Sequence, residues 1–131
     1  MTILNLTQHP ATPAQRKAGV IDMPDWLRTR LQKLLTFDTL PTASDVEQRA
    51  IRIAEMICDA DAELHPDTDI LEIQSVMIAG APYLMPPLHK HCSQYCKVLY
   101  AFSERKSVEQ TQPDGSVVKR TVFEHKGFVE L

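Results

Sequence analysis

The sequence predicts a three-layer α/β fold of the Rossmann-like class, with a mostly parallel sheet and a C-terminal antiparallel β-hairpin. Two observations predict it. Short apolar strand candidates alternate with amphipathic helix candidates, and a helix is what returns the chain between parallel strands. After Ser103 the pattern changes to two polar, β-branched stretches on either side of Pro113, Asp114 and Gly115, which is a turn sequence. We expect residues 1–131 to form a single domain, because 131 residues suffice for one core.

The first quarter of the chain predicts a strand followed at once by a helix. Residues 3–7 are mostly apolar and are expected to form the strand, which Pro10 ends. Thr12, Pro13 and Gln15 then supply an N-cap, a first-turn proline and the glutamine of a capping box.

Two longer helices are expected after a short extended piece at residues 20–23. From Asp25 onward leucines recur on one helical face, which is typical of a surface helix packed on a core. Ser44 and Glu47 form a candidate capping box for the next helix. Residues 45–60 carry apolar side chains at helical spacing and predict that helix.

The second half predicts strand, helix, strand and hairpin. Residues 76–79 suit a buried parallel strand, whereas residues 70–74 fit either a strand or a helix. The prolines at positions 82, 86 and 87 exclude an uninterrupted helix, and the helical face expected after them is formed by Leu88, Cys92, Tyr95 and Cys96. A third strand is expected at 98–102, a loop at 103–107, and hairpin strands at 107–112 and 116–123.

The carboxyl ends of the parallel strands are the expected ligand site, since ligands of such sheets bind beyond that edge. The segments that follow the strands, 5–9, 80–83 and 103–107, offer amides, hydroxyls, an imidazole, a glycine and two cations. These groups suit a small phosphate-bearing ligand. The candidate ligand-binding residues are Asn5, Thr7, Gln8, Gly80, Ala81, Ser103 and Lys106, and the candidate catalytic residues are His9, Arg105 and Ser107. In the alternative interpretation, the polar residues only tie down turns and Arg105 is a solvated charge.

Composition excludes several classes of protein. Fourteen basic against seventeen acidic residues argue against binding long duplex nucleic acid. A Walker lysine loop and a three-glycine dinucleotide fingerprint are absent from the sequence, which disfavours nucleoside triphosphate hydrolysis and nicotinamide binding. Neither a basic leader at residues 1–8 nor a membrane-spanning apolar run is present, so we expect a cytoplasmic protein without membrane contact. Three cysteines fit reduced thiols there.

One pattern of histidine and cysteine has two interpretations, and a further histidine has a structural one. His89, Cys92 and Cys96 stand three and four residues apart, so on one helix they could bind zinc. The alternative, which we adopt by assigning no metal, is that both cysteines pack in the core. His125 is interpreted as capping a turn at the end of a hairpin strand.

Several segments together resemble a known class of protein. They are Ile-Leu-Asn-Leu-Thr-Gln-His at 3–9, Gly-Ala-Pro-Tyr-Leu-Met at 80–85 and Ala-Phe-Ser-Glu-Arg-Lys-Ser-Val-Glu at 101–109, followed by Asp114-Gly115, Lys119, Phe123 and His125. In these segments and in element order, the chain resembles small stand-alone CRISPR-associated proteins of the CARF-like Rossmann class, ring nucleases among them, and their phage-borne relatives.

The resemblance implies a homodimer that binds cyclic oligoadenylate second messengers across a two-fold axis. It implies ring opening without metal or cofactor, by attack of a ribose 2'-hydroxyl on the adjoining phosphate. Residues matching the ligand edge are Asn5, Gln8, Ser103, Arg105 and Ser107, and proton transfer by His9 is our own assignment. Two other hypotheses are a module that binds or sequesters a nucleotide without cleaving it, and a phage protein-interaction domain.

Overall fold

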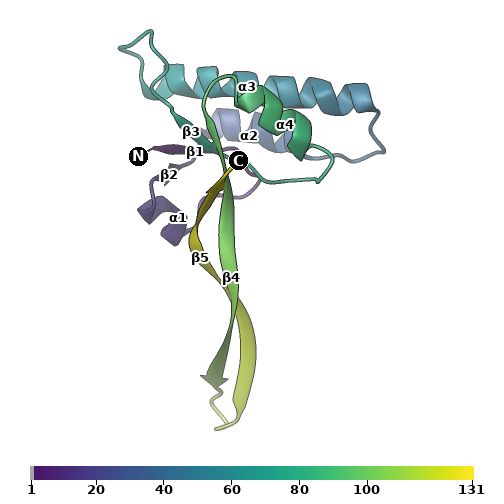
Figure 1. Ribbon diagram of the computed structural model, residues 1–131. Helices are drawn as coiled ribbons and strands as arrows, with labels where there is room; N and C mark the ends of the chain where they lie inside the picture. The colour runs from purple at the N-terminus through teal and green to yellow at the C-terminus, as the bar shows by residue number, and fades with distance from the viewer. Residues whose placement is uncertain (1) are drawn as a thin grey trace.

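A five-stranded sheet forms the centre of the molecule in the computed structural model, which describes residues 2–131 (Figure 1). Its strands are β1 (Ile3–Asn5), β2 (Val20–Ile21), β3 (Ser75–Met77), β4 (Lys97–Thr111) and β5 (Val117–Glu130). Their order across the sheet is β2-β1-β3-β4-β5. The first four strands pair in parallel and β5 pairs antiparallel with β4. The predicted fold class is therefore confirmed.

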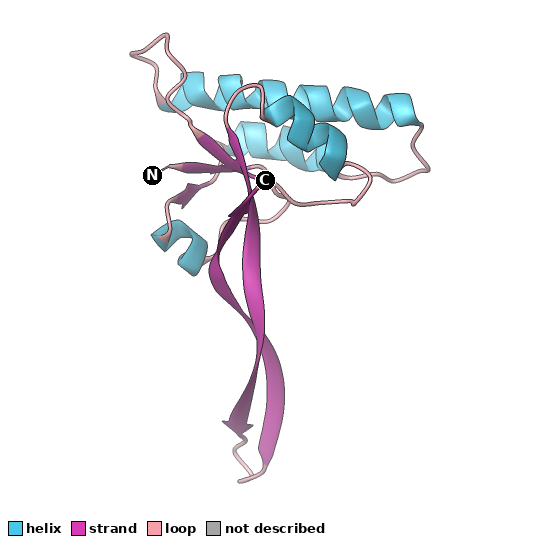
Figure 2. Ribbon diagram, in the orientation of Figure 1, coloured by secondary structure: helices cyan, strands magenta, loops and turns pink. Residues whose placement is uncertain are grey.

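Helices lie on both faces of this sheet (Figure 2). The helices are α1 (Pro13–Lys17), α2 (Asp25–Leu35), α3 (Ala43–Leu64) and α4 (Met85–Cys92). Figure 1 shows α2, α3 and α4 together over one face, with the short α1 on the other side beside β2. The third layer is thus thin, and much of the sheet's second face is covered only by α1 and its flanking loop.

Strand alternation divides the core into two parts. Leu4 and Val76 face the helical layer and belong to the main cluster, which Ile53 and Ile57 of α3 complete. The intervening residues point to the other face, where Ile3, Val20, Met77 and Leu99 form a smaller cluster. Because successive side chains of a strand point to opposite faces, both faces of these short strands must be apolar.

Capping boxes begin both α1 and α3. In α1, Thr12 Oγ1 accepts the Gln15 N–H at 3.1 Å and Gln15 Oε1 accepts the Thr12 N–H at 3.0 Å, as predicted. In α3 the predicted Ser44–Glu47 box is wrong. The cap is Thr42, whose backbone is extended and whose side chain exchanges hydrogen bonds with Asp45. Ser44 lies inside the first turn, where a cap's extended backbone is not possible.

We expect Thr42→Ala to lower the free energy of unfolding by about 1 kcal/mol, the usual cost of losing an N-cap side chain. Ser44→Ala is the matched control and should change it by less than about 0.5 kcal/mol, because exposed surface substitutions rarely do more. Urea unfolding of both variants gives the two values. Equal losses would contradict the observed cap.

Several boundaries in the second half differ from prediction: the strand predicted at 76–79 is Ser75–Met77, and the last strand, predicted at 116–123, runs to Glu130. Residues 70–74 are neither strand nor helix. Helix α4 already contains Pro86 and Pro87, because the first turn of a helix tolerates proline, and it ends before Tyr95 and Cys96. The loop predicted at 103–107 is wrong, since these residues continue β4 and pair with β5.

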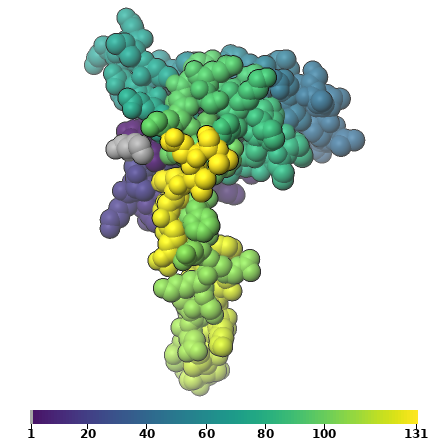
Figure 3. All heavy atoms as spheres, in the orientation of Figure 1, coloured from purple at the N-terminus to yellow at the C-terminus, as the bar shows by residue number. Residues whose placement is uncertain are grey.

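The β4–β5 hairpin extends far beyond the sheet. Its ladder runs from Leu99 opposite Glu130 to Thr111 opposite Val117, with a bulge beside Phe102. The predicted turn is confirmed: Gly115, at φ +88°, donates its N–H to the Gln112 carbonyl at 3.0 Å. Figure 3 shows the outer part of the hairpin as a narrow arm projecting from the body of the protein.

Within residues 2–131 no helix has both the length and the apolar character needed to cross a lipid bilayer.

Candidate functional site

The carboxyl edge of the sheet is where the predicted site residues of β1 and β3 meet. Asn5 ends β1 and pairs with Met77, the last residue of β3. The next strand, β4, passes this edge at Leu99 and continues into the arm. Two clefts flank the edge, and His9 lines both of them. The edge predicted from sequence therefore carries concave surface on both faces of the sheet.

Asn5 is buried and its amide is fully used inside the protein. Its Nδ2 donates to the His9 carbonyl and to Asp22 Oδ1, both at 2.8 Å. Its Oδ1 accepts the Thr7 N–H at 2.8 Å and the Thr7 hydroxyl at 2.6 Å. Asn5 and Thr7 therefore hold the loop that carries His9, so the role the geometry gives Asn5 is positioning.

Asp22 anchors this loop from β2. Burial would raise the pKa of its carboxyl, but hydrogen bonds from the Asn5 amide and the Ala11 N–H, together with Arg16, lower the pKa below its ordinary 3.8. Arg16 Nη2 lies 2.6 Å from Asp22 Oδ2. A lowered carboxyl pKa contributes stability above pH 4 that is lost as the pH falls further.

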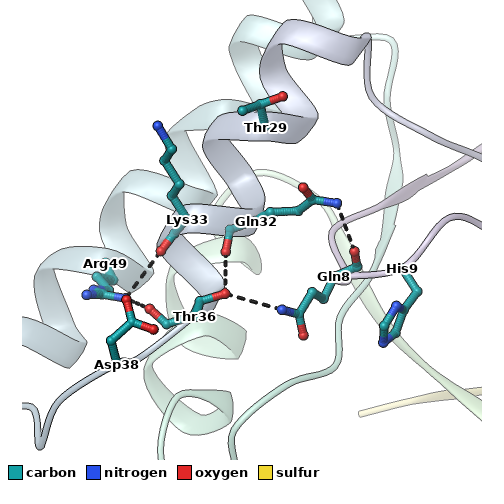
Figure 4. A pocket seen from close by; sticks show the side chains of 8 residues that line it. All are labelled: Gln8, His9, Thr29, Gln32, Lys33, Thr36, Asp38 and Arg49. Carbon is teal, nitrogen blue, oxygen red and sulfur yellow. Dashed lines mark hydrogen bonds between the residues drawn. The ribbon is translucent and has the colours of Figure 1, made fainter.

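The first cleft, the α2 cleft, lies between the β1 loop and the two long helices, with a volume of about 620 Å³ (Figure 4). Its lining residues are Gln8, His9, Thr29, Gln32, Lys33, Thr36, Asp38 and Arg49. Gln8 donates to Thr36 Oγ1 at 3.2 Å, and Gln32 donates to the Gln8 carbonyl at 3.3 Å. These bonds fix the β1 loop on the last turn of α2.

Arg49 closes the end of α2 from the neighbouring helix. Its Nη1 donates to the carbonyls of Lys33, Leu34 and Thr36, and its guanidinium lies 4.2 Å from the Phe37 ring centroid. Sequence analysis missed this residue, because nothing in the sequence links Arg49 to a helix end 13 residues earlier. Since the C-terminal end of a helix carries partial negative charge, this cleft is poorly suited to a phosphate despite its two cations.

The second cleft, the α1 cleft, lies on the other face of the sheet and has a volume of about 310 Å³. Its lining residues are Thr7, His9, Pro10, Thr12, Gln15, Met77, Ile78, Ala79, Tyr100 and Ala101. The walls are mostly apolar, and a few hydroxyls, an amide and an imidazole supply polar contacts. Among the described residues, no acceptor is found for Gln15 Nε2. An apolar cleft with a few polar groups is what a planar organic ligand requires.

Three predicted residues of the hairpin share the face of the α1 cleft. Ser103, Arg105 and Ser107 alternate along β4 in step with Leu99, whose side chain packs in the smaller core cluster on the α1 side of the sheet, so they lie on the same face of the strand. Tyr100, on the opposite face of β4, also lines the α1 cleft. Lys106 points to the opposite side. We call the side with Ser103, Arg105 and Ser107 the cleft face of the arm. Arg105 lies about 13 Å beyond Ala101, at about 3.3 Å per residue.

Aromatic side chains from β5 lie on the same cleft face. Phe123 pairs with Arg105, whose guanidinium carbon is 5.8 Å from the phenyl centroid. His125 pairs with Ser103 inside the strand, so its predicted place at a turn is wrong. Its ring lies 4.9 Å from that of Phe128, and in the described part of the chain its buried Nδ1 has no hydrogen-bond partner.

The predicted site residues that follow β3 have structural roles in the turn toward α4 and in the core. Gly80 has φ +155°, and an added Cβ would lie 3.4 Å from Met85 Cε, so glycine is needed where the chain turns toward α4. Ala81 packs, partly buried, against the main core. Neither residue lines the α1 or α2 cleft.

The histidine and cysteine pattern of α4 does not come together as a metal site. His89 Nδ1 lies 3.0 Å from the Tyr100 hydroxyl, and Cys92 is fully buried. Burial raises the pKa of Cys92 to about 12 and that of Cys96 to about 11, so both remain thiols at neutral pH. Over residues 2–131, no three His, Cys, Asp or Glu side chains gather as metal ligands.

A short parallel sheet with helices on both faces, clefts at its carboxyl edge and a long terminal hairpin define this chain as a small Rossmann-like α/β protein. More particularly, it belongs to the Uncharacterized protein MJ1673 family, whose model matches residues 1–129. The match includes the hairpin, so the arm is part of the family's common sequence. No curated protein and no solved structure matches the chain.

Proposed function

We propose that this protein binds cyclic oligoadenylate through the α1 cleft and the cleft face of the arm, and opens the ring without a metal ion. The observation that carries the proposal is that Ser103, Arg105 and Ser107 point to the same side as the α1 cleft. A pocket suited to a base is thus followed, along one face of β4, by a row of phosphate-binding groups. The proposal includes the homodimer that the sequence resemblance implies.

The α1 cleft supplies contacts for an adenine. Met77, Ala79 and Pro10 offer apolar walls, and the amide of Gln15 can hydrogen-bond the edge of a base. Nearby on the arm, the exposed Phe123 ring offers a second surface on which a base can stack.

Arg105 and the two serines supply contacts for phosphate. A guanidinium can bind two phosphate oxygens at once, and a hydroxyl can donate to a third. The stretch of about 13 Å between Ala101 and Arg105 separates the cleft from the phosphate-binding groups.

In the proposed reaction His9 removes the proton of a ribose 2'-hydroxyl. The 2'-oxygen then bonds to the adjoining phosphorus, and the bond from phosphorus to the 5'-oxygen breaks. The leaving 5'-oxygen takes the proton back from the imidazolium, so that no water is consumed. The product is a linear oligoadenylate with a 2',3'-cyclic phosphate and a 5'-hydroxyl. Arg105, about 13 Å further along the strand, binds a neighbouring phosphate and so holds the ring against the cleft.

The test is to incubate the purified protein with cyclic tetra-adenylate or cyclic hexa-adenylate in EDTA and separate the products by chromatography. We expect a linear product ending in a cyclic phosphate. If neither ring is bound or opened, the proposal is wrong.

Binding without cleavage is the second candidate function. It is favoured by the exposed ring of His9, for which no orienting hydrogen bond is found among residues 2–131. A general base is usually held in place by a neighbour. In the same experiment, an intact ring that comigrates with the protein supports this candidate.

We expect Arg105→Ala to raise the Kd for the ring about tenfold or more, because a hydrogen bond to a charged group contributes about 1.5–3 kcal/mol. Lys106→Ala is the matched control: it removes the same charge from the opposite face and should change the Kd less than about twofold. Titration calorimetry at fixed salt measures both. Equal effects would indicate charge attraction without a defined site.

A further inference from the structure

We propose that the other face of the arm is the surface through which two copies of this chain pair, with the arms antiparallel. We call it the valine face, because Val108, Val118 and Val122 lie on it, and Phe102 lies on it nearer the sheet. This proposal takes from the proposed function only the expectation that two chains form a dimer. What it adds is the surface through which they pair, and the sedimentation test of that surface uses no nucleotide.

The apolar content of this face is the first reason. Phe102, Val118 and Val122 are 51%, 43% and 37% exposed, and the face continues into Val129, which is 44% exposed. A two-stranded ribbon standing alone in water is marginally stable. An arm with a row of exposed apolar side chains therefore gains stability when a second surface covers that row.

The charges of the arm favour a protein partner over nucleic acid. Between residues 103 and 126 there are five lysines and arginines and four acidic residues, so the arm is nearly neutral. A surface that binds nucleic acid by its phosphates needs a clear basic excess.

The charges on the valine face are also distributed so that the face complements itself. Near the sheet it carries Glu104 and Glu124 with Lys126, whereas toward the tip it carries Arg120; Lys106 lies between them, 3.7 Å from Glu124 of its own chain. If two arms lie antiparallel with Val118 against Phe102, Arg120 of each arm meets Glu124 and Glu104 of the other. An interface related by a two-fold axis requires this kind of self-complementarity.

The length of the arm allows the contact to be continuous. The ladder from Ser103 to Thr111 is about 26 Å long at about 3.3 Å per residue. In the antiparallel arrangement, Val118 near one tip reaches Phe102 at the base of the other arm. Beside that base lies an apolar cleft of about 480 Å³, lined by Met85, Pro86 and Leu131 among others. The second copy covers this cleft as well.

Such pairing leaves the two cleft faces pointing outward. Each chain then binds its own ligand, so the expected stoichiometry is one ring per chain and not, as the sequence resemblance implies, one ring across the two-fold axis. One ring per two chains would contradict the pairing through valine faces.

The test is sedimentation equilibrium of the full chain, whose mass is 14.8 kDa. We expect the wild-type protein to sediment at twice this mass and Val122→Glu to sediment as a single chain. Thr121→Glu is the matched control, because it places the same charge one residue away on the cleft face, and it should remain a dimer. Both positions are exposed, so both variants should fold, and circular dichroism checks this.

A charge exchange provides a second test. Arg120→Glu should dissociate the dimer, and adding Glu124→Arg to it should restore the dimer. A single-chain mass for the wild-type protein overturns the proposal and the homodimer together. A dimer that persists in Val122→Glu overturns the valine-face interface and leaves the nucleotide site standing. Loss of ring binding with an intact dimer overturns only the proposed function.

Discussion

Replacing Asn5 by alanine is expected to lower the free energy of unfolding by about 3 kcal/mol, since each buried polar group left without its partner costs about 1–3 kcal/mol. The substitution removes four hydrogen bonds. It leaves the Thr7 N–H without an acceptor and Asp22 without one of its donors. Chemical denaturation of wild-type and variant protein measures the loss. An unchanged stability with weakened ligand binding would show instead that Asn5 contacts a ligand directly.

Asn5→Asp is the informative companion variant. It retains an oxygen acceptor for Thr7 but places a carboxylate where Nδ2 now lies 2.8 Å from Asp22 Oδ1. Two adjacent carboxylates raise the pKa of one of them, so the folded variant binds a proton that the unfolded chain has lost. Its stability should therefore rise as the pH falls from 7 to about 5. The wild-type carboxyl of Asp22 has a lowered pKa and gives no such rise.

His9→Ala is expected to slow opening of the cyclic oligoadenylate by about 100-fold or more, the usual contribution of a general base. The Kd for the ring should change less than about threefold, because the base and the phosphate are held by other residues. Single-turnover assays separate the rate from the affinity. His65→Ala, at the end of α3 and remote from the edge, serves as the histidine control.

Added imidazole gives a more specific check on this assignment. If the ring nitrogen of His9 moves the proton, free imidazole should restore part of the rate in His9→Ala and none in Arg105→Ala. Full activity of His9→Ala would show that His9 is not the base, and it would leave the binding site as proposed.

The sequence predicted helices and their caps well where these depend only on residues close together in the chain. The leucines of α2 and the capping box of Thr12 with Gln15 are found as expected, because helical periodicity and caps depend on neighbours within one or two turns. The α3 cap was misplaced by two residues. Thr42 and Asp45 satisfy the same pattern as Ser44 and Glu47, and the sequence does not decide between them.

The candidate site was predicted in part. The carboxyl edge follows from parallel topology, and Thr7, Gln8 and His9 do line clefts there. The roles of Arg49 and Asn5 could not be predicted, because each depends on contacts with residues at least 13 positions away. Ser103, Arg105 and Ser107 were expected in a loop and lie in a strand.

The sequence alone determined the order of strands and helices, the apolar faces that form the core and the turn at Gly115, since these depend on the spacing of neighbouring residues. Only the tertiary structure decided that β4 continues past the sheet and that Lys106 points away from Arg105. It also decided that the Asn5 amide makes its hydrogen bonds to other residues of the protein. The physical reason is that pairing with β5 fixes the direction of every side chain along the arm, and strand pairing joins residues far apart in the chain.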